Sequence, residues 1–233
     1  KWDFVNSEFQ FNEDEIPEIS GYTPIDDYQV HNANLFVSEF LIKVGKLTKN
    51  NFLINDGINS GKFALKEQFE DGFLPYWGLS QTDLYSNGKI HVDHYHSGFE
   101  IRSLFSIYNE INDKIWKNAY IKYYNWYSKN LFSNSNFPMY TINSLYPINI
   151  HSCAEAILCK SKLSKSKKNQ EKLLNMTLNI IKKMEFKPGN YSYIIRKFIG
   201  IEIKTDIALF RWGQAWMFLS LLEMLDSSIN KFK

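Results

Sequence analysis

The sequence has few cysteines, few prolines and almost no excess of charge of either sign. Its two cysteines, Cys153 and Cys159, lie in a stretch with helical periodicity, where a spacing of six residues makes their side chains diverge. A disulfide between them is therefore not expected, and neither belongs to a C-x-x-C metal pattern. We interpret both as reduced core residues, which indicates a reducing, cytoplasmic compartment.

The charges nearly cancel, because 27 basic residues face 25 acidic ones and give a net charge of +2. A general nucleic-acid binder depends on neutralising phosphates and carries a large basic excess, so no nucleic-acid partner is expected. The one basic run, Lys160–Lys172, lies between two helical stretches. We interpret it as a solvated hairpin and not as a site for polyanions.

Long hydrophobic runs are absent. The most apolar stretch, Ala215–Leu225, is too short for a membrane span and contains Glu223, and nothing resembles a signal peptide. With 233 residues, the chain can bury about 70% of its unfolded surface in one core. We expect a single domain over residues 1–233 that lacks an N-terminal part, because the chain begins at Lys1 and not at Met.

Helical periodicity occurs in seven stretches, where apolar residues recur at intervals of three and four positions. We expect helices at about 31–48, 56–70, 96–111, 113–131, 151–164, 168–185 and 208–229. The connections at 71–77, 136–140 and 188–193 combine aromatic residues with glycine or proline, a composition that predicts short β-hairpin loops.

Every second helix begins with a similar cluster of polar, small and aromatic residues. The clusters start at His31, His96, His151 and Arg211, which gives a repeat of about 60 residues, the length of a helix pair with its loop. Such pairs stabilise one another by stacking. The predicted fold is all-α, an α/α toroid that forms a partial or complete (α/α)6-like barrel of stacked helix hairpins with short β-hairpin loops.

Corresponding positions of neighbouring repeats meet in space, so these clusters are expected around one cavity. Carboxylates and histidines at such a place can transfer protons, arginine can hold an anion, and aromatic rings can stack on sugar rings. The candidate catalytic residues are Asp93, His96, His31 and His151. The candidate substrate-binding residues are Arg211, Trp212, Asp27, Asn34, Trp77, Tyr140, Tyr146 and Gln214. Asp93 with Asp26 or Asp27 is the candidate carboxylate pair of a glycosidase.

Helix capping competes with a catalytic role for two glutamates. Ser97-x-x-Glu100 and Ser152-x-x-Glu155 match the capping box, in which both side chains satisfy the first N–H groups of a helix. We therefore expect Glu100 and Glu155 to be caps.

Structural roles also compete for the other candidates. Any of the histidines can be a hydrogen-bond bridge between neighbouring repeats, and Trp212 and Trp216 can pack the inner wall. Arg211 can pair with an Asp in place of a ligand anion. Three converging histidines would suit zinc, but no H-x-x-x-H or H-E-x-x-H spacing supports it, and we predict no metal and no other cofactor.

Four ordered motifs carry a family resemblance. They are His31-Asn32-Ala33-Asn34, Asp93-His94-Tyr95-His96-Ser97-Gly98-Phe99, Tyr146-Pro147-Ile148-Asn149-Ile150-His151-Ser152 and Arg211-Trp212-Gly213-Gln214-Ala215-Trp216. Together they are similar to a bacterial and archaeal family of the VpsJ type, found among polysaccharide-biosynthesis genes, over about Tyr22 to Leu225. Ser97 and Asn149 depart from the family pattern, which has threonine and aspartate there. The resemblance implies an α/α toroid related in shape to glycoside hydrolases and sugar epimerases, and no established reaction.

We therefore predict a carbohydrate-active protein of surface-polysaccharide metabolism that takes an oligosaccharide or polysaccharide ligand. The first hypothesis is a glycoside hydrolase, lyase or epimerase-like enzyme with acid/base residues at the N-termini of the inner helices. The alternative is a non-catalytic glycan-binding or assembly protein that uses the same cavity. A third hypothesis is a metal-dependent α/α-barrel enzyme of another chemistry.

Overall fold

The computed structural model describes residues 2–3, 8–9, 28–82, 87, 89–163 and 166–229. The chain divides into two compact units, Lys1–Val92 with Phe99–Trp126, and Asp93–Gly98 with Tyr127–Lys233. The expectation of a single domain over the whole chain stays a prediction. Among the described residues, every helix is too short or too polar to cross a membrane.

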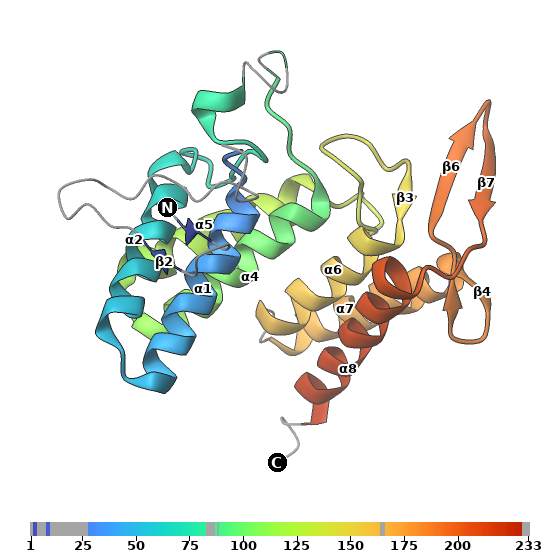
Figure 1. Cartoon of the computed structure of the whole chain (residues 1–233). Helices are drawn as coiled ribbons and strands as arrows, with labels where there is room; N and C mark the ends of the chain where they lie inside the picture. The colour runs from blue at the N-terminus through green and yellow to red at the C-terminus, as the bar shows by residue number, and fades with distance from the viewer. Residues whose placement is uncertain are drawn as a thin grey trace. The chain divides into compact units, whose positions relative to one another are not determined.

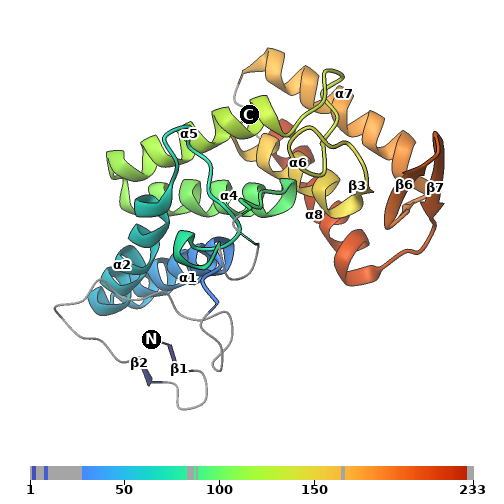
Figure 2. The ribbon, with the colours of Figure 1, turned by 90° about the horizontal axis from the view of Figure 1, so that it is seen from above.

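The first unit is built from helix pairs. Helices α1 (His31–Thr48) and α2 (Asn51–Glu67) lie side by side in Figure 1. Helices α4 (His94–Ile111) and α5 (Lys114–Asn130) run side by side in Figure 2, and each belongs partly to the first unit and partly to the second. A short 3-10 turn, η1, spans Leu79–Gln81. The two-residue strands β1 (Trp2–Asp3) and β2 (Glu8–Phe9) pair in antiparallel fashion.

The second unit combines three helices with small sheets. Its helices are α6 (Ile150–Leu163), α7 (Lys167–Met184) and α8 (Ala215–Ile229), and α8 follows a π-helical turn, η2 (Phe210–Gln214). Strands β3 (Ile148–Asn149), β6 (Ile194–Phe198) and β7 (Ile201–Thr205) form one antiparallel sheet. Strands β4 (Glu185–Lys187) and β5 (Asn190–Tyr191) form a second, and β6–β7 projects as a hairpin (Figure 1).

All seven predicted helices are present. Two starts differ most: α8 begins at Ala215 and not near residue 208, because the π-helical turn η2 precedes it, and α2 begins at Asn51 and not near residue 56. Lys49 takes the left-handed conformation that ends α1, and the Asn50 side chain accepts hydrogen bonds from the N–H groups of Phe52 and Leu53. A capping asparagine thus starts the helix before the first residues with clear apolar periodicity.

Each unit has its own apolar core, and most of its largest fully buried side chains come from the helices. In the first unit they include Leu35, Ile42, Ile101, Leu104, Ile107 and Tyr123, and in the second Leu131, Ile150, Ile157 and Leu158. Cys153 and Cys159 are also buried core residues, and no disulfide joins them, as predicted.

A backbone contact defines the repeat. The first residue of α1, α4 and α6 donates its N–H to the carbonyl of a loop tyrosine. The three contacts are His31 to Tyr76 (3.4 Å), His94 to Tyr140 (3.0 Å) and Ile150 to Tyr193 (3.2 Å). The N–H groups of the same tyrosines donate across their loops to the carbonyls of His91, Ser144 and Thr205. The loops are therefore hairpin-like, as predicted.

This contact corrects the register expected from the sequence. Position for position, His31 corresponds to His94 and to Ile150, whereas the sequence clusters aligned it with His96 and His151. The sequence alignment was shifted by two residues in one repeat and by one in the next. The cause is that the anchor is a backbone N–H group, which any residue except proline can supply, so the repeat does not need a histidine at this position.

Candidate functional site

The second unit contains a cavity of about 270 Å³ at the N-terminal end of α6. Its walls are three aromatic rings, a histidine and an amide, contributed by Tyr95, Asn149, His151, Tyr193 and Trp212. They come from the first turn of α4, from β3 and α6, from the loop before β6 and from the π-helical turn before α8. This concave site combines aromatic faces with hydrogen-bonding groups, so it can both stack on a small ligand and orient it.

An aspartate–histidine pair lies beside this cavity. The Nδ1 atom of His96 is 2.6 Å from Oδ2 of Asp93, and the His96 ring lies 4.1 Å from the ring of Tyr95, centroid to centroid. Since an ionised carboxylate can only accept, the proton of this contact belongs to Nδ1, which leaves the lone pair on Nε2. The His96 side chain is 18% exposed and that of Asp93 only 3%. His96 is therefore the member of the pair that a ligand can reach.

The fold places the pair by helix capping. Asp93 directly precedes α4, and its Oδ1 accepts the N–H of His96 at 3.0 Å, while its carbonyl accepts the Ser97 hydroxyl at 2.7 Å. One carboxylate thus satisfies the first turn of the helix and orients a histidine. Asn149 occupies the same position before α6 and accepts the N–H of His151 at 2.7 Å.

His151 is surrounded by aromatic rings. Its ring stacks on Tyr95 at 4.8 Å with an interplanar angle of 9°, and it contacts Trp216 at 4.9 Å and Trp212 at 5.7 Å. It is 5% exposed and lines the cavity. The expectation that Trp212 and Trp216 pack the inner wall fits Trp216, whereas Trp212 is 53% exposed and lines the cavity.

Two loop tyrosines complete this region. Burial raises the pKa of Tyr140, and the negative charges of Asp93 and of an ionised Tyr193 raise it further. Tyr140 therefore keeps its proton at neutral pH and remains a hydrogen-bond donor. Tyr140 was expected to bind substrate, and Tyr193 belongs to the connection 188–193, which was expected to form a β-hairpin loop. The carbonyls of Tyr140 and Tyr193 accept the first N–H groups of α4 and α6, so both tyrosines lie at the N-terminal ends of these helices.

The neighbouring His94 is structural. Its Nδ1 lies 3.0 Å from the carbonyl oxygen of Leu131 and its Nε2 2.6 Å from the hydroxyl of Tyr127. The side chain is fully buried, and burial lowers the pKa of His94 to about 3. A neutral ring that donates to a carbonyl and accepts from a phenol is the hydrogen-bond bridge expected for one of the histidines.

The capping-box interpretation is wrong for both glutamates, because α4 and α6 begin earlier than predicted, at His94 and Ile150, and are capped by Asp93 and Asn149. Glu100 lies inside α4 and accepts the Tyr123 hydroxyl at 2.6 Å. Glu155 is fully buried and packs on Gly98, where a Cβ atom would lie 2.3 Å from its Cγ. Gly98 is thus needed for the close approach of this carboxylate.

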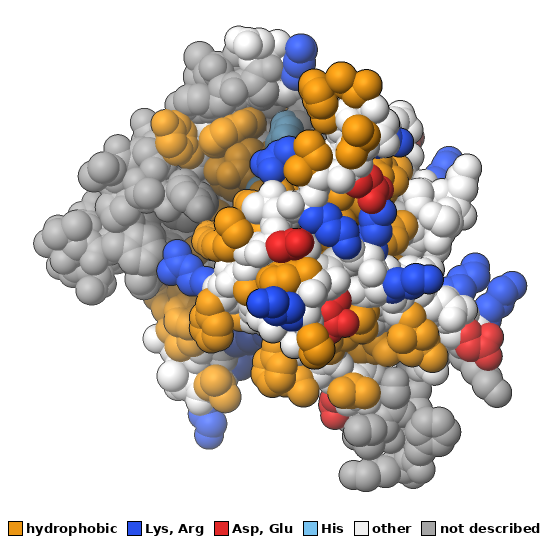
Figure 3. Space-filling view, turned by 90° about the vertical axis from the view of Figure 1, so that its right-hand side faces the viewer, with side chains coloured by type: hydrophobic (Ala, Val, Ile, Leu, Met, Phe, Trp, Pro, Cys, Tyr) orange, Lys and Arg blue, Asp and Glu red, His pale blue; other side chains and the backbone are white. Residues whose placement is uncertain are grey.

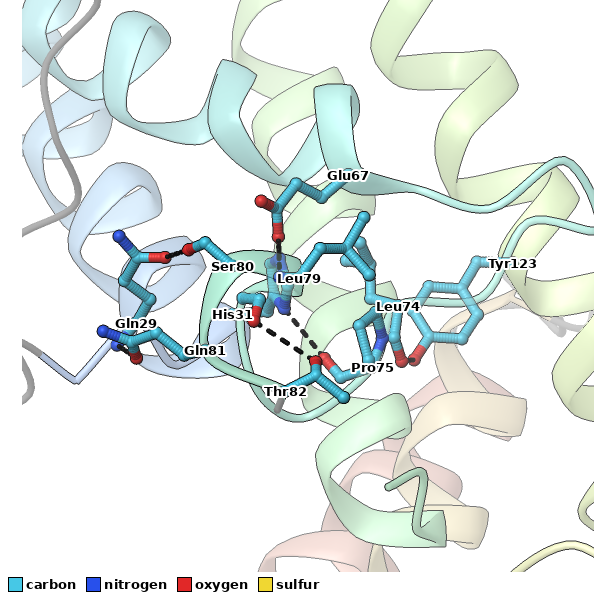
Figure 4. A network of polar contacts seen from close by, with 11 residues as sticks. Gln29, His31, Glu67, Leu74, Pro75, Leu79, Ser80, Gln81, Thr82 and Tyr123 are labelled. Carbon is cyan, nitrogen blue, oxygen red and sulfur yellow. Dashed lines mark hydrogen bonds and ion pairs between the residues drawn. The ribbon is translucent and has the colours of Figure 1, made fainter. Parts of the chain in front are cut away.

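In the first unit, His31 occupies the helix-opening position and is fully buried. Its Nδ1 lies 2.8 Å from the carbonyl oxygen of Pro75, and its Nε2 makes an ion-pair contact of 2.9 Å with Glu67 (Figure 4). Glu67 also accepts the N–H of Leu79 at 2.9 Å, and Phe63 stacks on the imidazole. These contacts enclose the ring and tie α1 to α2 and to the loop. The catalytic role expected for His31 stays a prediction.

The other candidates of the first unit make local contacts. Asn34 is buried and donates to the Ser60 hydroxyl at 2.8 Å, and Trp77 packs against Tyr28 and Tyr76. Asp26 and Asp27 lie outside the described residues, so the carboxylate pair that they were expected to form with Asp93 stays a prediction.

Four substrate-binding candidates of the second unit do not line the cavity: Tyr140, described above, and Gln214, Arg211 and Tyr146. Gln214 holds strand β5, since it accepts the N–H of Tyr191 and donates to its carbonyl. Arg211 is exposed, with its guanidinium 5.7 Å from the Trp212 ring. Tyr146 lines a different cavity. Across the described part of the chain, no group of three or more His, Cys, Asp or Glu side chains is arranged to hold a metal ion.

Several solved structures share this arrangement. An α-1,6-mannanase from Salegentibacter sp. matches with a TM-score of 0.66 and 12% identity over 91% of this chain and 61% of its own. Cellobiose 2-epimerase from Bacillus thermoamylovorans matches with 0.64 and 16% over 88% and 61%. A family 88 glycosyl hydrolase from Bacteroides vulgatus matches with 0.61 and 14% over 87% and 64%. An inactive variant of the mannanase is in complex with α-1,6-mannotriose.

These likenesses define the class of the fold, which is the predicted α/α toroid. The chain spans somewhat under two thirds of the length of these neighbours. No family model matches the sequence, and no curated protein matches it.

Proposed function

We propose that the protein is a carbohydrate-active enzyme and that the cavity beside the Asp93–His96 pair binds a sugar. The observation that carries the proposal is the 2.6 Å contact of these two side chains next to a cavity of sugar-ring size with aromatic walls. The toroid neighbours, a mannanase and an epimerase by name, support the choice of carbohydrate.

The cavity walls suit a saccharide. The rings of Tyr193 and Trp212 offer apolar faces to the C–H groups of a pyranose, while the Asn149 amide and the tyrosine hydroxyls can hydrogen-bond its hydroxyls. Such a mixture of stacking and directional contacts gives affinity for sugars without a large buried apolar area.

His96 is the proposed proton-transfer group. With its Nδ1 proton held by Asp93, Nε2 can accept a proton from a sugar carbon or hydroxyl and return it later in the cycle. Asp93 acts as a positioning residue, because its charge stabilises the imidazolium that forms and fixes the tautomer before it forms. Tyr140 is a protonated group near Asp93 that can donate a proton or a hydrogen bond.

The lining favours an epimerase or lyase over a two-carboxylate hydrolase. Among the described residues, the cavity wall contains His, Tyr, Trp and Asn but neither Asp nor Glu. Hydrolysis by the usual mechanism needs two carboxylates at the scissile bond, whereas proton abstraction and return need only an acid/base group such as His96.

Turnover in D2O separates these reactions. The wild type is incubated with α-1,6-mannotriose, cellobiose and a panel of acidic oligosaccharides, and products are analysed by chromatography and mass spectrometry. Epimerisation or elimination incorporates deuterium or gives an unsaturated product, while hydrolysis gives shorter sugars. The proposal requires that His96→Gln abolishes the product. A product that persists in this variant would overturn the assignment of His96.

One observation favours the alternative of a non-catalytic glycan-binding protein. The Asp93 carboxylate is buried and already caps α4, so its contacts are accounted for by the fold alone. This alternative predicts glycan binding without product. The role in surface-polysaccharide metabolism, the cytoplasmic location and the absence of a cofactor stay predictions.

A further inference from the structure

Strand β3 separates the candidate site from a second, larger cavity. Successive residues of a strand point to opposite faces. Asn149 accordingly lines the 270 Å³ cavity, while Ile148 and Tyr146 line a cavity of about 400 Å³. Tyr146, which precedes β3, lines the larger cavity together with Ile148 and does not belong to the first site.

The second cavity has an aromatic and aliphatic floor. Phe137, Leu145, Tyr146 and Ile148 line it, and Ile148 is buried. The Tyr146 ring is fixed at its hydroxyl, which donates a hydrogen bond to Glu202 on strand β7. This hydrogen bond favours the protonated phenol. Together with burial and the negative charge of Glu202, it raises the pKa of Tyr146 to about 12. The aromatic surface is therefore held in place without a ligand.

The opposite side of the cavity is basic. Lys182 and Lys183, in the last turn of α7, line it. Glu202 neutralises Lys183 at 2.5 Å, but none of the ion pairs found among the described residues includes Lys182. Residues 182–204 contain six basic residues against two acidic ones. Figure 3 shows Lys and Arg side chains spread over the side of the molecule that carries the β6–β7 hairpin.

We propose that this cavity is a second saccharide subsite and that it takes an anionic sugar, a hexuronate or a sugar phosphate. The ring stacks on Tyr146 and Phe137, the Asn179 amide on α7 contacts hydroxyls, and the anionic group meets Lys182. The choice of a sugar rests on the proposed function, whereas the anionic character follows from the lysines. A positive edge opposite a rigid aromatic floor is complementary to a sugar that carries a single charged substituent.

An NMR titration tests the subsite. Methyl signals of Leu145 and Ile148 are followed in the full chain with glucuronate, glucose 1-phosphate and glucose as probes. Both anions are expected to shift these signals and to bind about fivefold more tightly than glucose, as one screened charge contact allows. If only one of the two anions shifts the methyl signals, that anion identifies the charged group that the subsite takes.

Matched variants measure how much the lysine and the tyrosine of the cavity contribute to the affinity for the anions. Lys182→Gln should reduce the affinity for both anions about fivefold, while Lys168→Gln, an exposed position on the same helix, should not. Tyr146→Phe keeps the ring and should keep binding, whereas Tyr146→Ala should lose it. Equal affinity for glucuronate and glucose, or no effect of Lys182→Gln, would overturn the proposal.

The outcome is separable from that of the proposed function. Asp93 lies beside the other cavity and does not line this one, so Asp93→Asn should leave the binding of the anions unchanged. If the wild type turns over no sugar but these methyl signals shift, the proposed function fails and the subsite stands. If no anion shifts the signals, the subsite is wrong whatever the turnover.

Discussion

The helices α1 and α4 begin with the same backbone contact but carry different chemistry. In both, the first residue is a histidine whose N–H donates to a loop tyrosine. In α1, Val30 precedes that histidine and Ala33 follows two positions later, whereas in α4 the same places hold Asp93 and His96. The candidate pair is therefore an addition to one repeat, made at positions that the scaffold leaves open.

The comparison separates fully buried histidines from histidines at or next to the cavity. His31 and His94 open their helices and are fully buried, with carbonyls, a carboxylate or a phenol at their ring nitrogens. His96 lies two positions further along α4, where its ring contacts the cavity residue Tyr95, and His151 lies one position further along α6 and lines the cavity. Position relative to the backbone anchor decides whether a histidine lies in the interior or next to the cavity.

The largest expected effect is on turnover. Asp93→Asn should lower it at least about 100-fold, because asparagine neither fixes the required tautomer nor stabilises the imidazolium. The melting temperature should change little, since asparagine is as good a cap as aspartate and Asn149 fills this role before α6. Asp113→Asn, at the exposed cap of α5, is the matched control. A large stability loss with unchanged turnover would make Asp93 a structural residue only.

His31→Ala should chiefly affect stability. It opens a cavity and removes the partners of the Pro75 carbonyl and of Glu67, so urea denaturation should show a loss of about 3 kcal/mol. Turnover per folded molecule should remain as in the wild type if His31 is structural. A loss of turnover at full stability would restore its predicted catalytic role.

Gly98→Ala should destabilise the second unit by about 2 kcal/mol, because the added Cβ displaces the buried Glu155 side chain. Gly213→Ala provides a control on another inner helix, since its Cβ would meet only Ile150 at 3.1 Å. The free energies of unfolding of the two variants should differ by about 1 kcal/mol. Equal losses would show that the contact between Gly98 and Glu155 has no special role.

The pH dependence of stability should report His94. Its folded pKa is about 3, so between about pH 6 and pH 4 the unfolded chain binds a proton that the native state does not. Stability therefore falls as the pH falls, by about 1.4 kcal/mol per pH unit from this group. His94→Gln should remove that part of the slope, and His91→Asn, an exposed histidine, should not. An unchanged slope in His94→Gln would show that His94 titrates normally.

The sequence predicted the helices well because apolar periodicity is a local signal. The α/α toroid followed from the repeat of about 60 residues, even though the histidines used to align it were out of register. The alignment failed where the anchor is a backbone group that has no side-chain signature. The starts of α4 and α6 were missed for a related reason, since the true caps precede the Ser-x-x-Glu patterns by one turn in α4 and three residues in α6.

The candidate site was predicted in part. Asp93 and His96 could be proposed from their position near a helix start, and the structure places them in contact. The sequence could not show that Ile148 and Asn149 line different cavities, with Tyr146 on the side of Ile148, because the side-chain directions in β3 depend on its pairing with β6. Nor could it show that the Gln214 amide is used by the Tyr191 backbone.

The most direct test of the central claim follows the imidazole signals of all five histidines by NMR during titration with α-1,6-mannotriose, cellobiose and acidic oligosaccharides. Single-histidine variants assign the signals. The account predicts that a bound saccharide shifts the signals of His96 and His151, while those of His31 and His94 stay in place. Shifts confined to His31 or His94, or a saccharide that binds without changing His96, would contradict it.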